Sequence, residues 1–349
     1  MKNLLRNNLS LFIFLGAVVF FCRTFIIYGL LPIPADTIVG LYHPYRDFYS
    51  IDYPNGIAYK NFLITDPVRQ TFIWKELSID VLKSGKLPTW NPYEMSGTPL
   101  AANFQSSPYY LLNIILLVKP FYTSWSIFIL IQPFLAGLFM YLYLRNFRLH
   151  QVAAVFGGIT FAFSGFAVAW LEWGNIVSTA LWLPLILLAT EKLLIKITKK
   201  WILVLLIAQV SQIFAGHLQI YFYSFVFSTM YLIGRIIQIS KSEKSKDWIS
   251  SSFKKSAPFV IIGAITFIIT SISTIPAFQY ILLSARNADL THQLQDGWFL
   301  PWQHLVQFVA PDFFGNPSTL NYWGVWNYGE LVGYVGIIPL IFAIFALLS

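Results

Sequence analysis

The stretch SWSIFILIQPFLAGLFMYLYL, residues 124–144, decides the fold class of this chain. It contains no charged residue, and most of its positions are apolar. An α-helix needs about 20 predominantly apolar residues to cross the hydrocarbon core of a bilayer. The stretch therefore predicts a membrane-spanning helix.

The composition of the whole chain extends this prediction. Of its 349 residues, 57% are hydrophobic, 18% are aromatic and 11% are charged, and the mean hydropathy is +0.63. Soluble domains carry roughly 25% charged residues, so this chain lacks the polar residues to cover a water-facing surface. We expect an all-α polytopic membrane protein with about eight transmembrane helices. The expected spans are Leu11–Leu31, Ser124–Leu144, Val152–Leu171, Ile176–Ile195, Trp201–Ala215, Leu218–Ile237, Pro258–Ile275 and Leu331–Leu348.

Two apolar segments need separate interpretation. Leu11–Leu31 has the position of a signal peptide, but it lacks a small-x-small cleavage site and further spans follow it. We interpret it as an uncleaved helix. Tyr109–Val118 is too short to cross a bilayer and is expected to lie at the interface or to re-enter the membrane. The single cysteine, Cys22, excludes a disulfide framework within the chain.

Lysine and arginine residues gather in alternate connections. They lie at the N-terminus and between spans two and three, four and five, and six and seven. Basic residues mark cytoplasmic connections, so we expect a multi-pass protein of the cell membrane with a cytoplasmic N-terminus. Membrane topology then explains the formal charge of +8, and no nucleic-acid partner is expected. Most of the 15 acidic residues lie on the opposite, extracytoplasmic side, which suggests a site there.

Two long loops hold most of this acidic material. Residues 32–123 and 276–330 are both expected on the extracytoplasmic face, and loops longer than about 15 residues are usually functional or disordered. The first loop is rich in aromatic residues, and residues 68–85 have helical spacing with a Lys-Ser-Gly stop. We expect a single module over residues 1–349. Because no polar tail follows the last span, we also expect the chain to be part of a longer protein.

Several motifs carry a family resemblance. They are DPVRQ at 66–70, GKLPTWNP at 85–92, SGTPLAANFQSSPYY at 96–110, AGHLQI at 215–220, and the triplets YWG, YGE and YVG within 322–336. Together they resemble the YfhO-type bacterial membrane protein family over essentially the whole chain. These proteins are similar to the GT-C glycosyltransferases, multi-spanning enzymes that use polyprenyl-phosphate-linked sugars. The resemblance implies an extracytoplasmic active site with a catalytic acid in the first loop, and Asp66 matches that motif position.

Three acids are the candidate catalytic residues: Asp66, Asp36 and Glu172. Asp66 precedes Pro67, which disfavours helical geometry at residue 66 and favours a helix start just after it. Asp36 follows the first span closely, and Glu172 lies between two tryptophans at the membrane interface. Each has a structural alternative as a helix N-cap or a solvated acid. As a group they would suit Mg²⁺ or Mn²⁺ together with waters and phosphate oxygens.

Four further residues are candidates for binding the phosphate of a sugar donor: Arg286, His217, Arg69 and Gln70. Arg286 is the only lysine or arginine in the second long loop, and a guanidinium can contact a phosphate through two hydrogen bonds. Its alternative is an ion pair with Asp289. His217 lies in an extracytoplasmic turn, where a lone histidine is more often a structural group. Without a nearby cysteine or second histidine, it does not indicate a zinc site.

These observations lead to one functional hypothesis with two rivals. The first is an integral membrane glycosyltransferase that moves a sugar from a polyprenyl-phosphate donor to an envelope glycopolymer, lipid or protein. The second is a transporter or flippase, although the spans contain few internal charges of the kind that transporters use. The third is a non-catalytic member of the same family.

Overall fold

The protein is described here from a computed structural model. The structure describes residues 2–35, 42–48, 50–51, 54, 62–118, 120–242, 248–284, 299–319, 321–325 and 327–348. Asp36 and Arg286, two of the candidate residues, lie outside these ranges.

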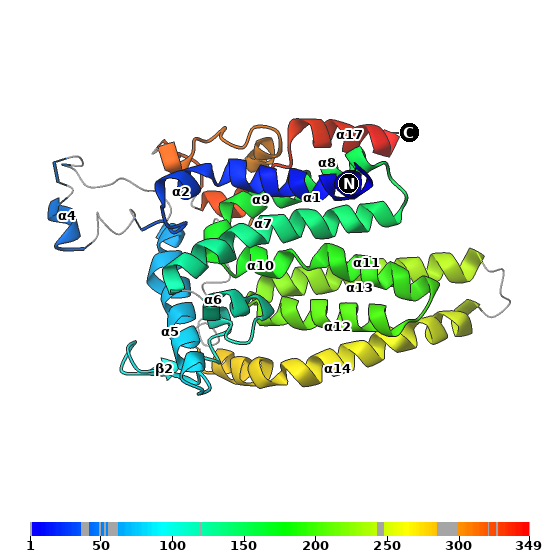
Figure 1. Ribbon diagram of the computed structural model, residues 1–349, viewed down its shortest axis with the longest axis horizontal. Coiled ribbons are helices and arrows are strands. Elements are labelled where there is room, and N and C mark those ends of the chain that lie inside the picture. The colour runs from blue at the N-terminus through cyan, green and yellow to red at the C-terminus, as the bar shows by residue number, and fades with distance from the viewer. Residues whose placement is uncertain are drawn as a thin grey trace.

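The molecule is a bundle of apolar helices that run back and forth along one axis (Figure 1). Among the described residues, four helical segments are long and apolar enough to cross a membrane: Phe121–Asn146, Ile176–Ile195, Leu218–Ser242 and Ser250–Leu282. Shorter apolar helices cover Leu9–Phe21, Gln151–Ala162 and Ile337–Leu348. The predicted class, an all-α membrane protein, is therefore confirmed. The bundle helices are α1 (Lys2–Phe21), α2 (Arg23–Tyr28), α7 (Phe121–Asn146), α8 (Gln151–Ala162), α9 (Gly165–Ala169), α10 (Ile176–Ala180), α11 (Leu183–Ile195), α12 (Lys199–Phe214), α13 (Leu218–Ser242), α14 (Trp248–Leu282) and α17 (Ile337–Leu348).

Helix α7 forms the centre of the bundle because it packs against α1, α8 and α11. Its side chains Trp125, Phe128 and Ile129 are fully buried and belong to the main hydrophobic cluster. A helix that is apolar on all sides needs neighbours or lipid around it. Residues 124–144, which predict the fold class, thus also form the helix against which several others pack.

Several predicted spans differ from the observed helices. The first, Leu11–Leu31, is divided at Cys22 into α1 and α2 and ends at Tyr28. The span 152–171 is broken after Ala162, because the hydroxyl of Ser164 accepts a hydrogen bond from the amide of Ala167 and starts a new helix, α9. The last span was predicted from Leu331, but α17 begins at Ile337 after Gly336, whose φ of +99° does not fit a helix. Helix α14 reaches Leu282 and so extends into the predicted second loop.

A layer of short elements covers one end of the bundle. We call it the end cap and define it as the described parts of residues 62–118 and 299–331. Helix α5 lies across the bundle end, and the hairpin of β1 and β2 projects beside it (Figure 1). The elements of the first long loop are α4 (Tyr45–Phe48), η1 (Phe62–Thr65), η2 (Pro67–Thr71), α5 (Phe72–Lys83), β1 (Trp90–Asn91), β2 (Thr98–Pro99), η3 (Phe104–Ser106), η4 (Leu111–Asn113) and α6 (Ile114–Val118). Those of the second are η7 (Trp302–Phe308), η8 (Pro317–Thr319) and α16 (Tyr328–Leu331), while η5 (Leu171–Trp173) joins α9 to α10.

The first-loop part of the end cap is ordered as its sequence predicts. Helix α5 falls within the predicted helical range and stops before Gly85, which has a φ of +76°. Trp90 pairs with Pro99 in the antiparallel hairpin, and Trp74 donates from its indole nitrogen to Glu94 at 2.8 Å. The apolar segment 109–118 forms short helices that are too short to cross a bilayer, as predicted.

Lys75 is the most unusual anchor between the end cap and the bundle. Its side chain is 2% exposed, and its amine contacts the Asn113 side-chain oxygen at 3.2 Å, the Ser107 carbonyl at 3.4 Å and the Ser107 hydroxyl. The rings of Phe128 and Tyr110 lie 5.4 Å and 5.8 Å from the amine. Tyr110 extends the contact by donating to the carbonyl of Ser178 in α10 at 3.3 Å. Helix α5 is thereby tied to the core of the bundle.

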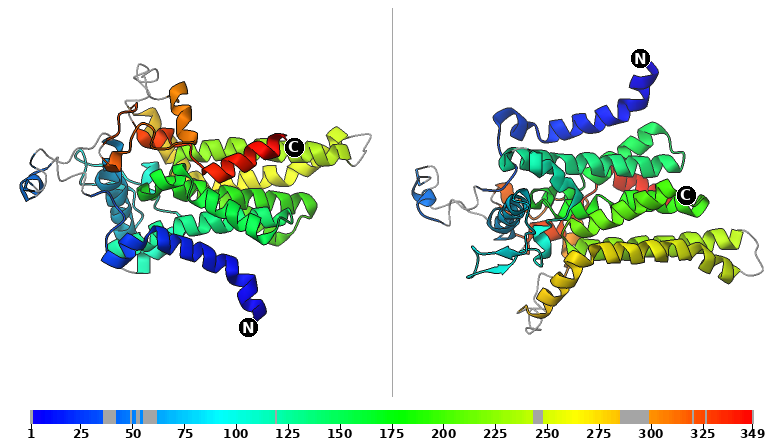
Figure 2. Two further views of the ribbon diagram at one scale, coloured as in Figure 1. Left: turned by 90° about the horizontal axis from the view of Figure 1, so that it is seen from above. Right: turned by 60° about the horizontal axis from the view of Figure 1, so that its bottom comes forward.

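The opposite end of the bundle is basic. Arg145, Lys196, Lys199, Lys241 and Lys254 lie near the helix ends there, and both chain termini point the same way (Figures 1 and 2). In both views of Figure 2 the end cap stays at the other end. We call the end of the bundle that carries these lysine and arginine residues the basic end.

One buried ion pair joins three helices on the side of the basic end. Glu191 of α11 is 3% exposed and accepts from Arg235 of α13, with Nε–Oε1 and Nη2–Oε2 distances of 2.6 Å and 2.9 Å. Tyr231 donates to the same carboxylate at 2.6 Å, and Tyr143 of α7 donates to Tyr231 at 3.1 Å. Among the described residues, the donors to Glu191 thus come from α13, and Tyr143 extends the network to α7.

Candidate functional site

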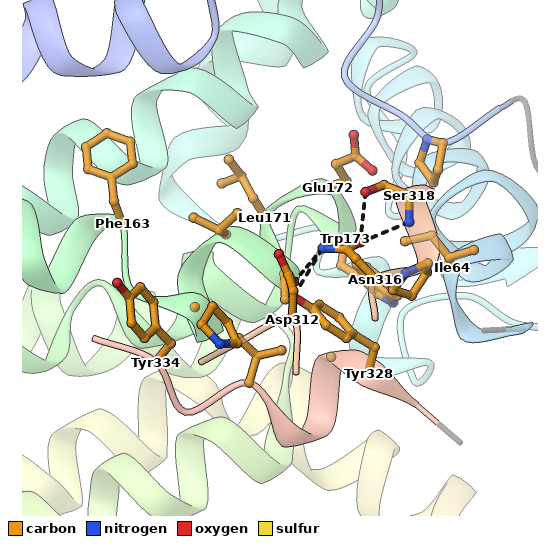
Figure 3. Close-up of a pocket in the computed structure, with 18 of the residues that line it drawn as sticks. Ile64, Phe163, Leu171, Glu172, Trp173, Asp312, Asn316, Ser318, Tyr328 and Tyr334 are labelled. Atoms are coloured by element: carbon orange, nitrogen blue, oxygen red, sulfur yellow. Dashed lines mark hydrogen bonds between the residues drawn. The ribbon is translucent and has the colours of Figure 1, made fainter. Parts of the chain in front are cut away.

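A cavity of about 720 Å³ lies where the bundle meets the end cap. Figure 3 shows its two kinds of wall: Phe163 and Tyr334 lie on one side of the view, Glu172 and Ser318 on the other, and Asp312 between them. The apolar wall includes Phe21, Phe25, Phe163, Val168 and Val332, and the polar wall includes Glu172, Asp312, Asn316, Ser318 and Tyr328. The cavity is therefore amphipathic.

The break between α8 and α9 shapes the apolar wall. Gly165 follows the break, and its amide donates to the carbonyl of Tyr334 at 2.7 Å. The chain before α17 can approach this closely because residue 165 has no side chain. A Cβ atom at Gly165 would lie 2.2 Å from a methyl group of Val332. The segment 332–334 thus closes one side of the cavity by packing directly on a glycine.

Glu172 is held on the polar wall by a rigid turn. It is the middle residue of η5, whose flanking Leu171 and Trp173 are buried. The turn ends at Gly174, with a φ of +74° that suits glycine. Trp170, just before the turn, donates to the carbonyl of Gly329 at 3.0 Å and joins it to the second long loop. The predicted acid at the membrane interface therefore lines a cavity rather than only meeting solvent.

Asp312 is a second carboxylate in the cavity, and sequence analysis gave it no role. Its Oδ1 accepts from the hydroxyl of Tyr328 at 2.8 Å and from the side-chain amide of Asn316 at 2.9 Å. The same Asn316 amide lies 3.3 Å from the Tyr328 hydroxyl. Both donors are neutral, so they orient the carboxylate without neutralising it. Burial and the neighbouring Asp312 raise the pKa of Tyr328, which remains a proton donor at neutral pH.

Asp66 lies next to this cavity but not on its wall. Its turn, η2, packs against the η5 turn that carries Glu172, and Ile64, just before it, lines the cavity. The prediction of non-helical geometry was wrong: Asp66 has φ −59° and ψ −40°, because it lies inside a continuous helical segment that begins with η1 and runs through η2 into α5. The N-cap alternative also fails, since the carboxylate makes no capping hydrogen bond.

The surroundings of Asp66 favour a neutral carboxyl more than water does. Partial burial raises its pKa, and the nearby charge of Arg69 opposes that shift. Gln70 donates to its Oδ1 at 3.5 Å, a long hydrogen bond. Arg69 itself is exposed. The three polar residues of the DPVRQ motif therefore lie close together.

His217 lies outside the end cap as defined, in the turn between α12 and α13. Its Nδ1 accepts from the amide of Ile220 at 3.4 Å, and Gly216 beside it packs on Phe104 and Ser107. Burial lowers the pKa of His217 to about 4, so the imidazole is neutral at pH 7. It does not line the cavity that contains Glu172 and Asp312.

Residues 98–349 match the family described as bacterial membrane protein YfhO. The chain belongs to this family. The predicted resemblance is confirmed, and the protein is a bacterial membrane protein. No curated protein and no solved structure matches the chain.

Most of the residues that line the cavity lie within the range matched by the YfhO family. Glu172, Asp312, Asn316 and Tyr328 lie within the matched residues, whereas Asp66 lies before them. The wall built from η5 and the second long loop thus lies inside the matched range. Within the part of this YfhO chain that the structure describes, no three His, Cys, Asp or Glu residues gather closely enough to hold a metal ion.

Proposed function

We propose that this YfhO-family protein is an integral membrane glycosyltransferase of the GT-C type, with about eight membrane passes. It would transfer a sugar from a polyprenyl-phosphate donor to an envelope glycopolymer, lipid or protein. The proposal rests on the amphipathic cavity between bundle and end cap. An apolar wall suits a prenyl chain, and a polar wall suits a sugar and its phosphate.

The alternating direction of the helices supports the proposed topology. Each expected span overlaps at least one helix, and successive spans run in opposite directions along the bundle (Figure 1). The basic residues gather at one end and the end cap covers the other. By the positive-inside rule the N-terminus is cytoplasmic and the end cap is extracytoplasmic. A flipped, lipid-linked sugar would then reach the cavity from the outer leaflet.

In the proposed reaction, an acceptor hydroxyl attacks the anomeric carbon of the donor. A carbon–oxygen bond to the acceptor forms, the bond to the phosphate oxygen breaks, and polyprenyl phosphate leaves. Asp66 would take the hydroxyl proton or support the leaving phosphate, with Glu172 and Asp36 assisting. Burial raises the pKa of Asp66, which makes its carboxylate a stronger base than that of an exposed aspartate.

The phosphate contacts of the proposal fall on Arg286, Arg69, Gln70 and His217. Arg69 is exposed and one turn from Asp66, so it can reach a substrate at the edge of the cavity. His217 is neutral and uses Nδ1 as an acceptor, which leaves Nε2–H as a hydrogen-bond donor but supplies no charge. Its distance from the cavity wall makes it the weakest of these assignments.

A divalent cation, Mg²⁺ or Mn²⁺, is a further part of the proposal. Mg²⁺ is often held by one or two carboxylates together with substrate phosphates. Glu172 on the cavity wall and Asp66 on the adjoining turn are the described residues that fit such a role. The metal would neutralise the charge of the leaving phosphate.

The test uses the purified protein in nanodiscs with a panel of polyprenyl-phosphate sugars, with and without Mg²⁺ or Mn²⁺. We expect release of polyprenyl phosphate with one sugar, and losses of about 100-fold or more in the Asp66→Asn and Glu172→Gln variants. Asp80→Asn is the matched control, because Asp80 is an exposed aspartate in α5 of the end cap. Full activity in Asp66→Asn would exclude its assigned role. Lipid translocation without sugar release would instead identify a flippase.

A further inference from the structure

A second cavity, of about 340 Å³, lies at the basic end of the bundle. It is formed where α11 ends and the N-terminal part of α14 passes by. Its lining includes three lysines, Lys196, Lys254 and Lys255, and the apolar side chains Leu193, Ile197 and Phe259. Among the described residues that line it, none is acidic.

The local backbone creates this cavity. Helix α11 ends at Ile195, and Lys196 is extended, with φ −155° and ψ 123°. Thr198 then caps α12 by accepting from the amide of Trp201 at 3.4 Å. The chain between the two helices is therefore an extended bridge, and it leaves space against α14. The bridge sets Lys196 opposite Lys254 and Lys255.

The charge of this cavity is concentrated and lies beside apolar surface. Lys255 donates to the hydroxyl of Ser251 at 2.9 Å, which fixes its position on α14, and Lys254 is exposed. Leu193 is 3% exposed, whereas Ile195 and Ile197 at the rim are 75% and 58% exposed. Such a rim is suited to contact with acyl chains, because exposed isoleucines at the end of a bundle meet lipid.

We propose that this cavity binds the phosphate headgroup of an anionic phospholipid. The three ammonium groups would contact the phosphate, and the glycerol and first acyl carbons would lie along Ile197 and Phe259. Basic pockets between membrane helices are suited to such headgroups. A free phosphate would use the lysines but not the apolar rim, so the lining favours the lipid. This inference does not depend on the proposed glycosyl transfer.

The test compares two triple variants with equal loss of charge. The site variant carries Lys196→Gln, Lys254→Gln and Lys255→Gln. The control carries Lys199→Gln, Lys200→Gln and Lys241→Gln, which change lysines of the basic end outside the lining of the cavity. Each protein, purified in a neutral detergent, is titrated with phosphatidylglycerol or phosphatidylcholine, and bound lipid is measured by native mass spectrometry.

We expect phosphatidylglycerol to bind the wild type more tightly than phosphatidylcholine. At about 1 kcal/mol for each basic residue near a headgroup, the site variant should bind roughly 100-fold more weakly and the control only a few-fold. Equal losses in both triples, or equal binding of the two lipids, would overturn the proposal. Competition by millimolar inorganic phosphate would assign the cavity to free phosphate instead. Lys254→Gln alone, at an exposed position, repeats the test if the triple variant does not fold, with an expected loss of about fivefold.

Discussion

The two ends of the bundle each bury a charged side chain, but they satisfy it in different ways. Glu191, at the basic end, meets the guanidinium of Arg235 in a bidentate pair. Lys75, at the end cap, meets a carbonyl, a hydroxyl, an amide oxygen and two aromatic rings, all of them neutral. Both side chains are almost fully buried.

The difference decides which charge can respond to conditions. An ion pair keeps both partners charged, because each favours the ionised form of the other. Neutral partners do not offset desolvation, and burial lowers the pKa of Lys75 from 10.5 to about 7. We infer that the end cap holds a charge that changes near neutral pH, whereas the buried carboxylate at the basic end is matched by a guanidinium.

The largest effect is expected from breaking the pair at the basic end. Arg235→Gln leaves the carboxylate of Glu191 buried without a counter-charge and should lower the free energy of unfolding by about 3 kcal/mol. The measurement is thermal unfolding in nanodiscs. The double variant Glu191→Gln with Arg235→Gln should recover part of this loss. A single variant as stable as the wild type would remove the contrast between the two ends.

The next largest effect concerns Asp312, the cavity carboxylate whose two hydrogen-bond donors are neutral. Asp312→Asn keeps the shape of the side chain and removes its charge, so we expect kcat/KM for the proposed transfer to fall about 100-fold, or about 2.7 kcal/mol. Exposed Asp80→Asn serves again as the control. If Asp312→Asn keeps its rate while Glu172→Gln loses it, only the η5 carboxylate belongs to the active site.

A pH experiment addresses Lys75 directly. Its pKa in the folded protein lies below the unfolded value, so the unfolded state binds more protons between about pH 7 and pH 10.5. The free energy of unfolding should therefore rise with pH in this window, by at most about 1.4 kcal/mol per pH unit from this group. Below pH 7 the contribution is constant.

Lys75→Met should remove this part of the slope, whereas Lys83→Met, at an exposed position of the same helix, should keep it. Denaturant unfolding at pH 7, 8 and 9 provides the comparison. An unchanged slope in Lys75→Met would mean that the amine keeps its proton throughout, with its three acceptors and two rings sufficient to hold the charge.

The smallest effect is expected from one donor to Asp312. Tyr328→Phe removes the 2.8 Å hydrogen bond and leaves the donor of Asn316 in place. A single hydrogen bond contributes about 1 kcal/mol, so kcat should fall about fivefold with little change in KM. Tyr334→Phe, on the apolar wall, is the matched control. Equal losses in the two variants would indicate a packing effect.

Much of the fold could be predicted because the length of an apolar run in the sequence indicates a membrane helix. The helices α7, α11 and α13, the cap helix α5 and the short segment 109–118 all agree with the sequence pattern. The break at Ser164 was missed, although serine is a strong helix N-cap. Hydropathy does not change across the break, so a window average cannot detect it.

The candidate site was predictable only in part, for a different reason. Glu172 was found because an acid at the membrane interface is unusual. Asp312 was not found, since its partners are 4 and 16 residues away in a loop without periodicity. Lys75 had a readable signal, because Phe72 and Ile79, three residues before it and four after it, are apolar and lie on the same face of the predicted helix. The roles of Asp36 and Arg286 stay predictions.

The contact of Gly165 with Val332 gives the cavity an adjustable wall. Because the two chains touch at the point where a side chain is missing, the volume on this side depends on a single position. An alanine or a larger residue there would push the segment 332–334 outward and displace the start of α17 with it. A substitution at this one position would therefore change the volume of the cavity without any change in the residues of its polar wall.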